Sequence, residues 1–458
     1  MNPGRTEKRN RWLPGILTVG TLMAGGRWIS HVPVGPAYIG DLLLFASVLH
    51  GLCAALTRKA TERTYGPGVL LALVVLFAAF RLLTTDADAD MRTAARDAAP
   101  FLYCCAGYLS SSAYQWAGEE SRKRAVRMLY GALLVHLVWV GAVLLAGDAM
   151  PGMPQLDAET RVFDLRPDFD AAMLGVLIGL SILRVRTGKG RLNVVVAASA
   201  LFLVFSMHTR AGLLACFACI AAAFVLRPKA AGRRPVRSVL LGCAVVLGVL
   251  LLLPGSSAGQ RFVATTGGVT TSQEAALSAE GTTRARMIAW RSVIGYTLDD
   301  PGRTAIGVGF GTDFLRLSDA DVPLGRGMGV RSPHNYLLTC FARLGLAGLS
   351  LVTALLASVL GAVARALRSR EADELTSLCV LLVVSLLVVA LLGVVLESPF
   401  GAVPFFWASG VLLGRKRLLR ARRRRIHQGP AEFVQEGELA ASRGPGVPDV
   451  KPLRECMR

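Results

Sequence analysis

Residues 375–396 read LTSLCVLLVVSLLVVALLGVVL, an apolar run that contains no charged residue. A helix of this length crosses the hydrocarbon core of a bilayer, which is roughly 30 Å thick. Similar apolar blocks recur along the chain, separated by short charged stretches, and they bring the apolar fraction to 53% and the charged fraction to 18%. Soluble domains usually contain about 25% charged residues. The composition therefore excludes a soluble enzyme, a disordered chain and a secreted disulfide scaffold.

The hydropathy pattern predicts about twelve transmembrane helices and hence an all-α, polytopic integral membrane protein. Basic residues follow every second span, which places both termini in the cytoplasm by the positive-inside rule. The excess of 51 Lys and Arg over 31 Asp and Glu, a net charge of +20, is therefore a topology signal and does not indicate a nucleic-acid partner. The first span should act as an uncleaved anchor, because no small-residue cleavage site follows it. The predicted spans are residues 13–29, 38–56, 66–84, 99–117, 128–147, 169–184, 192–208, 210–226, 237–254, 335–364, 375–396 and 402–414.

Four regions follow from these spans. Residues 1–254 hold predicted helices 1–9, and residues 335–425 hold helices 10–12 with a basic cytoplasmic end. Residues 426–458 are rich in Gly, Pro and Glu and are predicted to be a disordered cytoplasmic tail. Residues 255–334 form a large external loop that is too long for a plain connector. Within it the spacing of apolar residues predicts a helix over 284–298, then a Gly-rich turn and a second short helix.

Arginine, and no lysine, supplies the basic side chains of the predicted external face, and arginine suits bidentate recognition of phosphate. Arg210 lies at a turn between two predicted membrane helices, where a charge is costly unless it lines a cavity or pairs. The alternative for Arg210 is a side chain that reaches lipid headgroups. Arg284, Arg286 and Arg291 share the predicted loop helix, with 284 and 291 on one face. For each of these three alone, an ordinary solvated helix face is the alternative.

His334 lies in Ser-Pro-His-Asn, which ends the long loop and opens the next predicted span. An imidazole at this surface, near the arginines in chain order, suits general acid–base chemistry near neutral pH. A capping or packing histidine is the equal alternative. The Gly307-x-Gly309-x-Gly311 run is a weak nucleotide signal and indicates a tight turn. Cys216-x-x-Cys219 lies within an apolar span, where cysteine usually serves as a small hydrophobic residue, so no metal site is predicted.

Three stretches carry a resemblance to a known family: SMHTRAGLL (206–214), ARMIAWRSVIGYTLDDPGRTAIGVGFGTDFL (285–315) and SPHNYLLTCFARLGLAGL (332–349). They are similar to the Ser-x-Ser-Arg-Gly turn, the Gly-Arg-x-x-x-Trp, Asp-x-Pro and Gly-x-Gly-x-Gly sequence, and the His-Asn…Gly-x-x-Gly span opening of the bacterial O-antigen ligase and polymerase family. Thr209 replaces the second Ser of the first motif, and Ala211 precedes its Gly. The motifs do not separate ligase from polymerase.

The resemblance implies a GT-C-like helical fold in the bacterial inner membrane and an undecaprenyl-pyrophosphate-linked glycan donor. The glycan would pass to lipid A–core or to another glycan, without a nucleotide sugar, metal or other cofactor. Carried over by position, Arg210, Arg286 and His334 would be catalytic, although the neighbour Arg284 leaves the choice of loop arginine open. Arg284, Arg291 and Asn335 would bind substrate, and a weaker match in FDLRPDFDAAML (163–174) makes Arg166 a guess.

Two other classes of function remain open. A polysaccharide-related membrane transporter would also have about twelve helices, but such proteins usually place polar sites at mid-membrane. Here the predicted spans hold few ionisable residues at their centres, and the polar chemistry is concentrated outside them. A membrane scaffold that catalyses no reaction would not require arginines and a histidine at one external site. Uptake assays in proteoliposomes and substitution of Arg210 would separate these possibilities.

Overall fold

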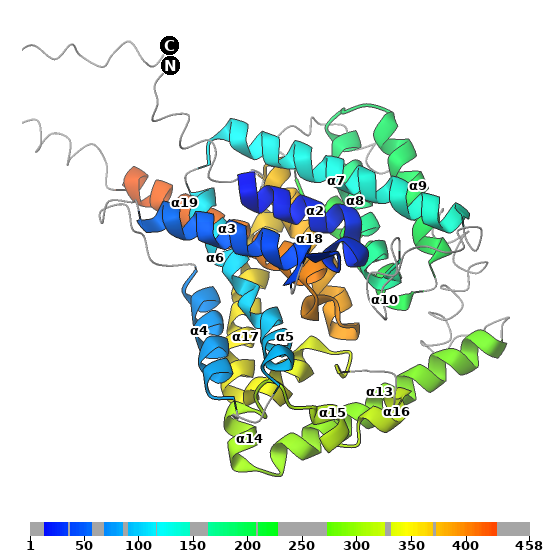
Figure 1. The fold of residues 1–458 in the computed structure, drawn as a ribbon. Helices are drawn as coiled ribbons and strands as arrows, with labels where there is room; N and C mark the ends of the chain where they lie inside the picture. Colours follow the sequence, from blue (N-terminus) through cyan, green and yellow to red (C-terminus); the bar gives the residue numbers. More distant parts are fainter. Residues whose placement is uncertain are drawn as a thin grey trace, which may run out of the picture. The chain divides into compact units, whose positions relative to one another are not determined.

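The computed structural model describes residues 13–34, 37–56, 68–85, 90–115, 117–146, 164–207, 209–227, 273–325, 331–369 and 372–427. The chain divides into two units, Met1–Arg415 and Lys416–Arg458, and the contacts discussed below belong to the first. The described residues are mostly helical (Figure 1). Their strands are β1 (Pro33–Val34) and β2 (Ala37–Tyr38), which pair antiparallel.

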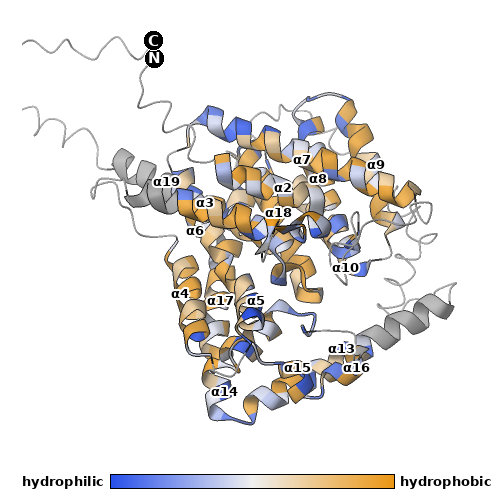
Figure 2. Ribbon diagram, viewed as in Figure 1, coloured by the Kyte–Doolittle hydropathy of each residue, from blue (hydrophilic) through white to orange (hydrophobic). Residues whose placement is uncertain are grey.

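Most described helices coincide with predicted spans and are strongly apolar along their length (Figure 2). The span predicted at 99–117 differs, because two helices, Met91–Leu102 and Cys104–Tyr114, stand in its place. Three helices are long and apolar enough to cross a membrane: Glu119–Ala146, Tyr336–Arg368 and Glu374–Leu392. The total of twelve spans remains a prediction, and the predicted span at 237–254 lies outside the described residues. The helices at the predicted spans are α2 (Leu13–Ser30), α3 (Ile39–Leu56), α4 (Val69–Leu83), α5 (Met91–Leu102), α6 (Cys104–Tyr114), α7 (Glu119–Ala146), α8 (Pro167–Arg186), α9 (Leu192–Ser206), α10 (Arg210–Val225), α17 (Tyr336–Arg368), α18 (Glu374–Leu392) and α19 (Pro399–His427).

Helices α8, α10 and α18 pack together, and α8 and α18 bury most of their residues. Ser385 of α18 donates a hydrogen bond of 2.9 Å to the Ala172 carbonyl of α8, which satisfies a hydroxyl that is shielded from solvent. Cys216 and Cys219 are buried in this packing as free thiols. Their setting fits the prediction of small hydrophobic residues. The first turns of α8 and α10 are fixed by this packing, and both turns carry residues of the candidate site.

Helix α17 is broken at Gly345, which has φ 61° and ψ −163°, so the single span predicted at 335–364 consists of two pieces. The Gly-rich turn packs into the break: the Val308 N–H donates to Ala342 O at 2.9 Å. A Cβ on Gly345 would lie 2.5 Å from the Ala305 carbonyl carbon, and one on Gly307 would lie 2.3 Å from that of Arg343. Side chains would therefore prevent the approach of the two backbones. The glycine run is a tight turn, as predicted.

The long loop is helical in its described part: α13 (Gln273–Leu298), α14 (Pro301–Ile306), α15 (Phe314–Leu317) and α16 (Asp321–Gly325). The helix predicted over 284–298 is confirmed as the second half of α13. Three short helices follow, where one was predicted. Asp300 caps α14, accepting the Arg303 N–H at 2.7 Å.

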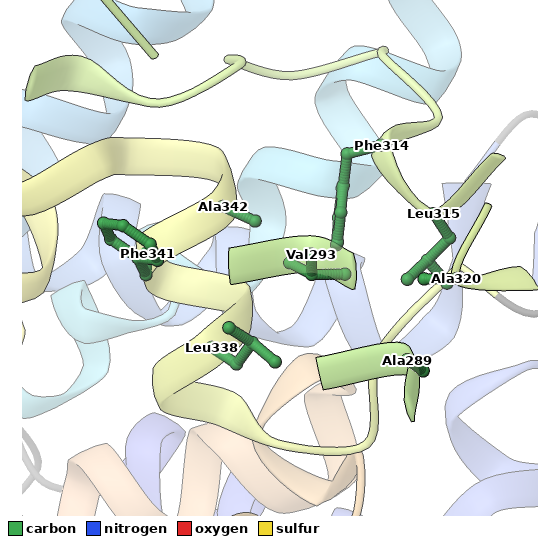
Figure 3. Packing of buried hydrophobic residues seen from close by; sticks show 8 residues of the cluster. All are labelled: Ala289, Val293, Phe314, Leu315, Ala320, Leu338, Phe341 and Ala342. Carbon is green, nitrogen blue, oxygen red and sulfur yellow. The ribbon is translucent and has the colours of Figure 1, made fainter. Parts of the chain in front are cut away.

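A small hydrophobic core holds these helices against the start of α17 (Figure 3). Ala289 and Val293 of α13 meet Phe314 and Leu315 of α15 on one side. On the other side they meet the first turns of α17. The residues that α17 contributes are Leu338, Phe341 and Ala342. This core fixes α13 relative to the turn that precedes α17.

Candidate active site

Arg210 is the first residue of α10, and its position follows from a local cap. Thr209 precedes it as the N-cap and accepts the Gly212 N–H through its hydroxyl at 3.3 Å. Threonine is a favoured residue at this position because its oxygen satisfies a free amide of the first turn. The Arg210 guanidinium reaches towards α13 and donates a hydrogen bond of 3.5 Å to the Thr283 hydroxyl.

Arg286 points from α13 to the carboxyl end of α18. Its Nη1 donates a hydrogen bond of 2.8 Å to the Leu392 carbonyl, one of the last carbonyls of that helix. Burial lowers the pKa of Arg286, the charge of Arg210 lowers it further, and Asp168 opposes the shift. The three charged groups therefore lie close enough to interact, although they come from three different helices.

Arg166 and Asp168 complete this charged cluster at the start of α8. Arg166 Nε and Asp168 Oδ1 form an ion pair of 3.0 Å, and the same oxygen accepts the Phe169 N–H at 2.9 Å. The backbone N–H of Arg166 donates to Asp170 Oδ2 at 2.6 Å. From the sequence Arg166 is only a guess as a site residue, and no motif identifies Asp168. The Pro at the start of α8 with two acidic residues in its first turn is a helix-start signal that could have indicated both.

His334 stands in the turn before α17 with φ 56°, a left-handed conformation that is uncommon for a residue other than glycine. Two hydrogen bonds hold the turn: Trp290 Nε1 donates to Pro333 O at 2.6 Å, and the His334 N–H donates to Ser332 Oγ at 3.2 Å. Such strained residues concentrate at functional sites, where the surroundings hold them in place.

The surroundings of His334 keep its imidazole neutral. Burial lowers its pKa to about 4, assisted by the charges of Arg286 and Arg166 and opposed by Asp168. The histidine and the arginine cluster are thus neighbours. A neutral imidazole has a free nitrogen lone pair at neutral pH and can accept a proton from a hydroxyl group.

Glu397, which sequence reasoning missed, supports the histidine turn from the short 3-10 helix η3 (Val395–Glu397). Its Oε1 accepts hydrogen bonds from Ser332 Oγ at 2.7 Å and from Thr339 Oγ1 at 2.9 Å. Burial raises the pKa of Glu397 to about 7. The hydroxyl that receives the His334 N–H is therefore itself positioned by this carboxyl group. No motif of the sequence indicates this link, which arises only from tertiary packing.

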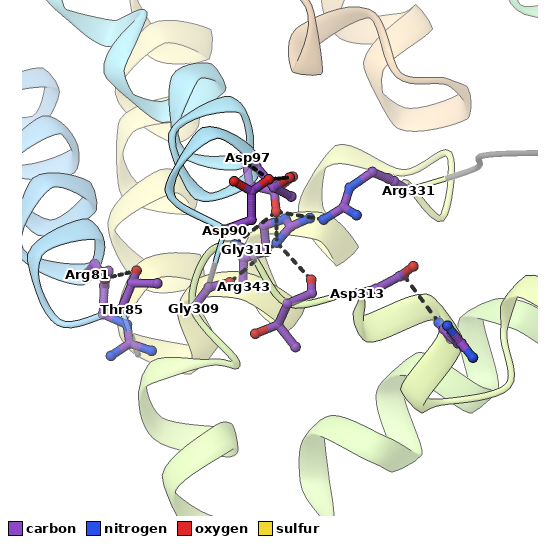
Figure 4. Close-up of polar contacts among 12 residues, drawn as sticks. Arg81, Thr85, Asp90, Asp97, Gly309, Gly311, Asp313, Arg331 and Arg343 are labelled. Carbon is purple, nitrogen blue, oxygen red and sulfur yellow. Dashed lines mark hydrogen bonds and ion pairs between the residues drawn. The ribbon is translucent and has the colours of Figure 1, made fainter. Parts of the chain in front are cut away.

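Asp97 of α5 holds the Gly-rich turn and α17 together (Figure 4). Its Oδ2 accepts hydrogen bonds from Arg343 Nη1 at 2.9 Å, Arg331 Nη2 at 3.0 Å and the Gly311 N–H at 3.1 Å. Arg343 and Asp97 are both buried, so loss of either side chain would leave the other as an uncompensated buried charge. This cluster fixes the segment on either side of the break at Gly345.

The other predicted site residues lie elsewhere. Arg284 and Arg291 are exposed, on the face of α13 opposite Arg286, and neither makes a hydrogen bond or ion pair with another described residue. The structure thus places Arg286, and not Arg284, beside His334. The Asn335 side chain is the N-cap of α17 and accepts the Leu338 N–H at 3.2 Å. Binding of substrate by Arg284, Arg291 and Asn335 stays a prediction.

The cluster has the character of an anion site with an adjacent base. Arg166, Arg210 and Arg286 bring three guanidinium groups to the cluster, and Asp168 and Asp170 bring two carboxyl groups, so that positive charge is still in excess. Guanidinium groups in a partly buried setting bind phosphate oxygens strongly. The neutral His334 lies beside them.

Comparison with known proteins agrees with the motifs. Residues 194–353 match the family model described as O-antigen ligase, and this segment covers about a third of the chain. Among curated proteins, no sequence matches the chain. Arg210, Arg286 and His334 all lie in the matched segment, whereas Arg166 and Glu397 lie outside it. The resemblance found in the sequence is thus confirmed, and the chain carries an O-antigen ligase family domain over residues 194–353.

Proposed function

We propose that this protein is a glycosyltransferase that moves a glycan from an undecaprenyl-pyrophosphate carrier to a hydroxyl group of lipid A–core or of a glycan. The reaction would take place at the outer face of the bacterial inner membrane, without a metal or nucleotide sugar. One observation carries the proposal: Arg286, held at the Leu392 carbonyl and close to Arg210, lies beside a neutral His334. Both parts of a glycosyl transfer, the anionic leaving group and the proton of the acceptor, then have a partner.

The arginine cluster would bind the pyrophosphate of the donor. Negative charge grows on the oxygen that bridges the sugar and the phosphate as the glycosidic bond breaks. Fixed cationic groups stabilise such charge because they need no reorganisation during the reaction. The hydrogen bond of Arg286 to Leu392 O holds its guanidinium at the carboxyl end of α18.

His334 would accept the proton of the acceptor hydroxyl. The hydroxyl oxygen forms a bond to the anomeric carbon while the bond from that carbon to the pyrophosphate oxygen breaks. The proton passes to the free nitrogen of His334, and undecaprenyl pyrophosphate leaves with the bonding electrons. Displacement from the opposite side inverts the anomeric configuration.

Deletion of the gene followed by glycan gel electrophoresis tests the proposal in the cell. Loss of a ligase leaves lipid-linked polymer that is not attached to lipid A–core. Loss of a repeat-unit polymerase, which is the alternative within the same family, leaves single repeat units. Wild-type protein should restore the normal pattern, and Arg286→Gln should not. An unchanged glycan pattern on deletion would contradict both.

A further inference from the structure

The face of α13 that is turned away from the protein is apolar. Met287 is 47% exposed, Ile288 47%, Ile294 41% and Leu298 55%. At 100° per residue these four positions fall within one arc of the helix, together with Arg284 and Arg291. The opposite arc carries the buried Ala289, Val293 and Thr297. Over residues 284–298 the exposed arc thus combines large apolar side chains with two arginines and no acidic residue, which is unlike the polar face of a solvated helix.

The packing of α13 places this face at the end of a membrane span. Val293 contacts the first piece of α17, before the break at Gly345, and Trp290 bonds to the turn that precedes that helix. The second piece of α17, residues 346–368, is about 34 Å long at 1.5 Å per residue, which is enough to cross the hydrocarbon core. The first piece and α13 therefore belong at the membrane surface.

We propose that residues 284–298 of α13 form a membrane-binding surface that lies in the headgroup region of the bilayer. Met287, Ile288 and Ile294 would enter the boundary between headgroups and acyl chains, at a depth of roughly 5–10 Å. Arg284 and Arg291 would contact the phosphates of anionic phospholipids, since each can extend its guanidinium along the apolar surface. The positive charge and the apolar side chains on one arc match an anionic lipid surface.

This assignment separates the arginines of α13 by function. Arg286 lies on the protein-facing side and belongs to the charged cluster, whereas Arg284 and Arg291 lie on the lipid-facing side. The helix would then fix the height of Arg286 relative to the membrane surface. The surface exists whatever the protein transfers, so the proposal does not depend on glycosyltransferase activity.

Fluorescence quenching by brominated lipids tests the proposal. Dansylalanine is introduced singly at Ile288 and Ile294 of the full chain, which is reconstituted in nanodiscs of phosphatidylethanolamine and phosphatidylglycerol. The same probe at Val138, 71% exposed in the apolar part of α7, is the lipid control. The probe at Lys123, whose side chain is 63% exposed at the charged end of α7, is the water control. Bromines are placed either near the headgroup or near the end of the acyl chain.

The probes at Ile288 and Ile294 should lose emission chiefly to the shallow bromines, and the probe at Val138 chiefly to the deep ones. Arg284→Gln with Arg291→Gln should reduce shallow quenching at Ile288, and replacement of phosphatidylglycerol by phosphatidylcholine should do the same. Quenching at both α13 positions no greater than at Lys123 would overturn the proposal, since water or a second copy of the chain would then cover the face. Insensitivity to lipid charge would overturn the role of the arginines.

Discussion

Ser332 and Glu397 are joined by a hydrogen bond of 2.7 Å, although 65 positions of sequence separate them. The same Ser332 hydroxyl oxygen accepts the backbone N–H of His334 at 3.2 Å. A carboxyl group near the last helix thus supports the strained turn that carries the candidate base. Because burial raises the pKa of Glu397 to about 7, this support depends on pH in the neutral range.

Glu397→Gln should change how the stability of the protein depends on pH. A folded-state pKa of about 7, above the ordinary value of 4.5, means that the contribution of Glu397 to stability is fully present below about pH 4.5. It is lost as the pH rises through about 7. The glutamine variant has no such titration, so its melting temperature should gain on that of the wild type between about pH 5 and pH 8. Thermal unfolding of the two purified proteins in detergent measures this, and a constant difference would contradict it.

Replacement of Arg286 by Ala should reduce transfer by roughly 10²–10³-fold, because a fixed donor to the developing charge is removed. Arg316→Ala in α15 is the control, because this arginine is exposed and lies outside the charged cluster. It should retain most of the activity. Initial rates with purified protein and lipid-linked donor give the comparison. Equal loss in both variants would contradict the placement of Arg286 in the site.

In the pH profile of the reaction, the fall in rate on the acid side, the acid limb, should lie well below the ordinary pKa of a histidine if His334 is the base. Burial, with Arg286 and Arg166, lowers its pKa to about 4, so the unprotonated base persists as the pH falls through 6.5. The profile of kcat/KM, which reports the free enzyme, should fall only near the lower value. His334→Ala should cost roughly 10²–10⁴ in rate and remove this limb. A loss of tenfold or less would make His334 a positioning residue.

Gly345→Ala should destabilise the fold by more than about 1–3 kcal/mol, since φ 61° with ψ −163° is a conformation that essentially only glycine adopts without strain. The new Cβ would also lie 2.5 Å from the Ala305 carbonyl carbon. Gly295→Ala in α13 is the control: its Cβ meets nothing within 4 Å. That change should stabilise the helix by roughly 0.5–1 kcal/mol. Chemical denaturation in detergent distinguishes the two, and equal effects would contradict the close packing at Gly345.

The sequence predicts the helices well because long apolar runs leave the backbone few alternatives. The observed bounds of α8, α9, α10 and α18 lie within a few residues of the predicted ones. By contrast, α7 begins earlier and α19 ends later than predicted, and the span predicted at 99–117 is divided between α5 and α6. The break in α17 is harder to predict. Gly345 lies in a stretch that is apolar except for Arg343, and only the approach of the Gly-rich turn shows why the helix breaks there.

Site residues could be predicted where the sequence immediately around them indicates their role. Arg210 stands out because charge at a turn between apolar helices is costly, and His334 because it opens a span. Asp168 and Glu397 cannot be recognised in this way, because they interact with residues that are distant in sequence and no periodicity links them. The choice between Arg284 and Arg286 also required the structure, since either residue fits the motif but only one faces inwards.

The position of Asp97 in the chain has a consequence for biosynthesis. Arg331, one of its partners, follows 234 residues later. At a synthesis rate of roughly 5–20 residues per second, Asp97 waits on the order of ten to fifty seconds for this partner. Glu397 arrives later still. A chain that ends before Glu397 would thus present arginines beside an unsupported histidine turn. Asp97 would stay without Arg331 and Arg343 until about three quarters of the chain had been made.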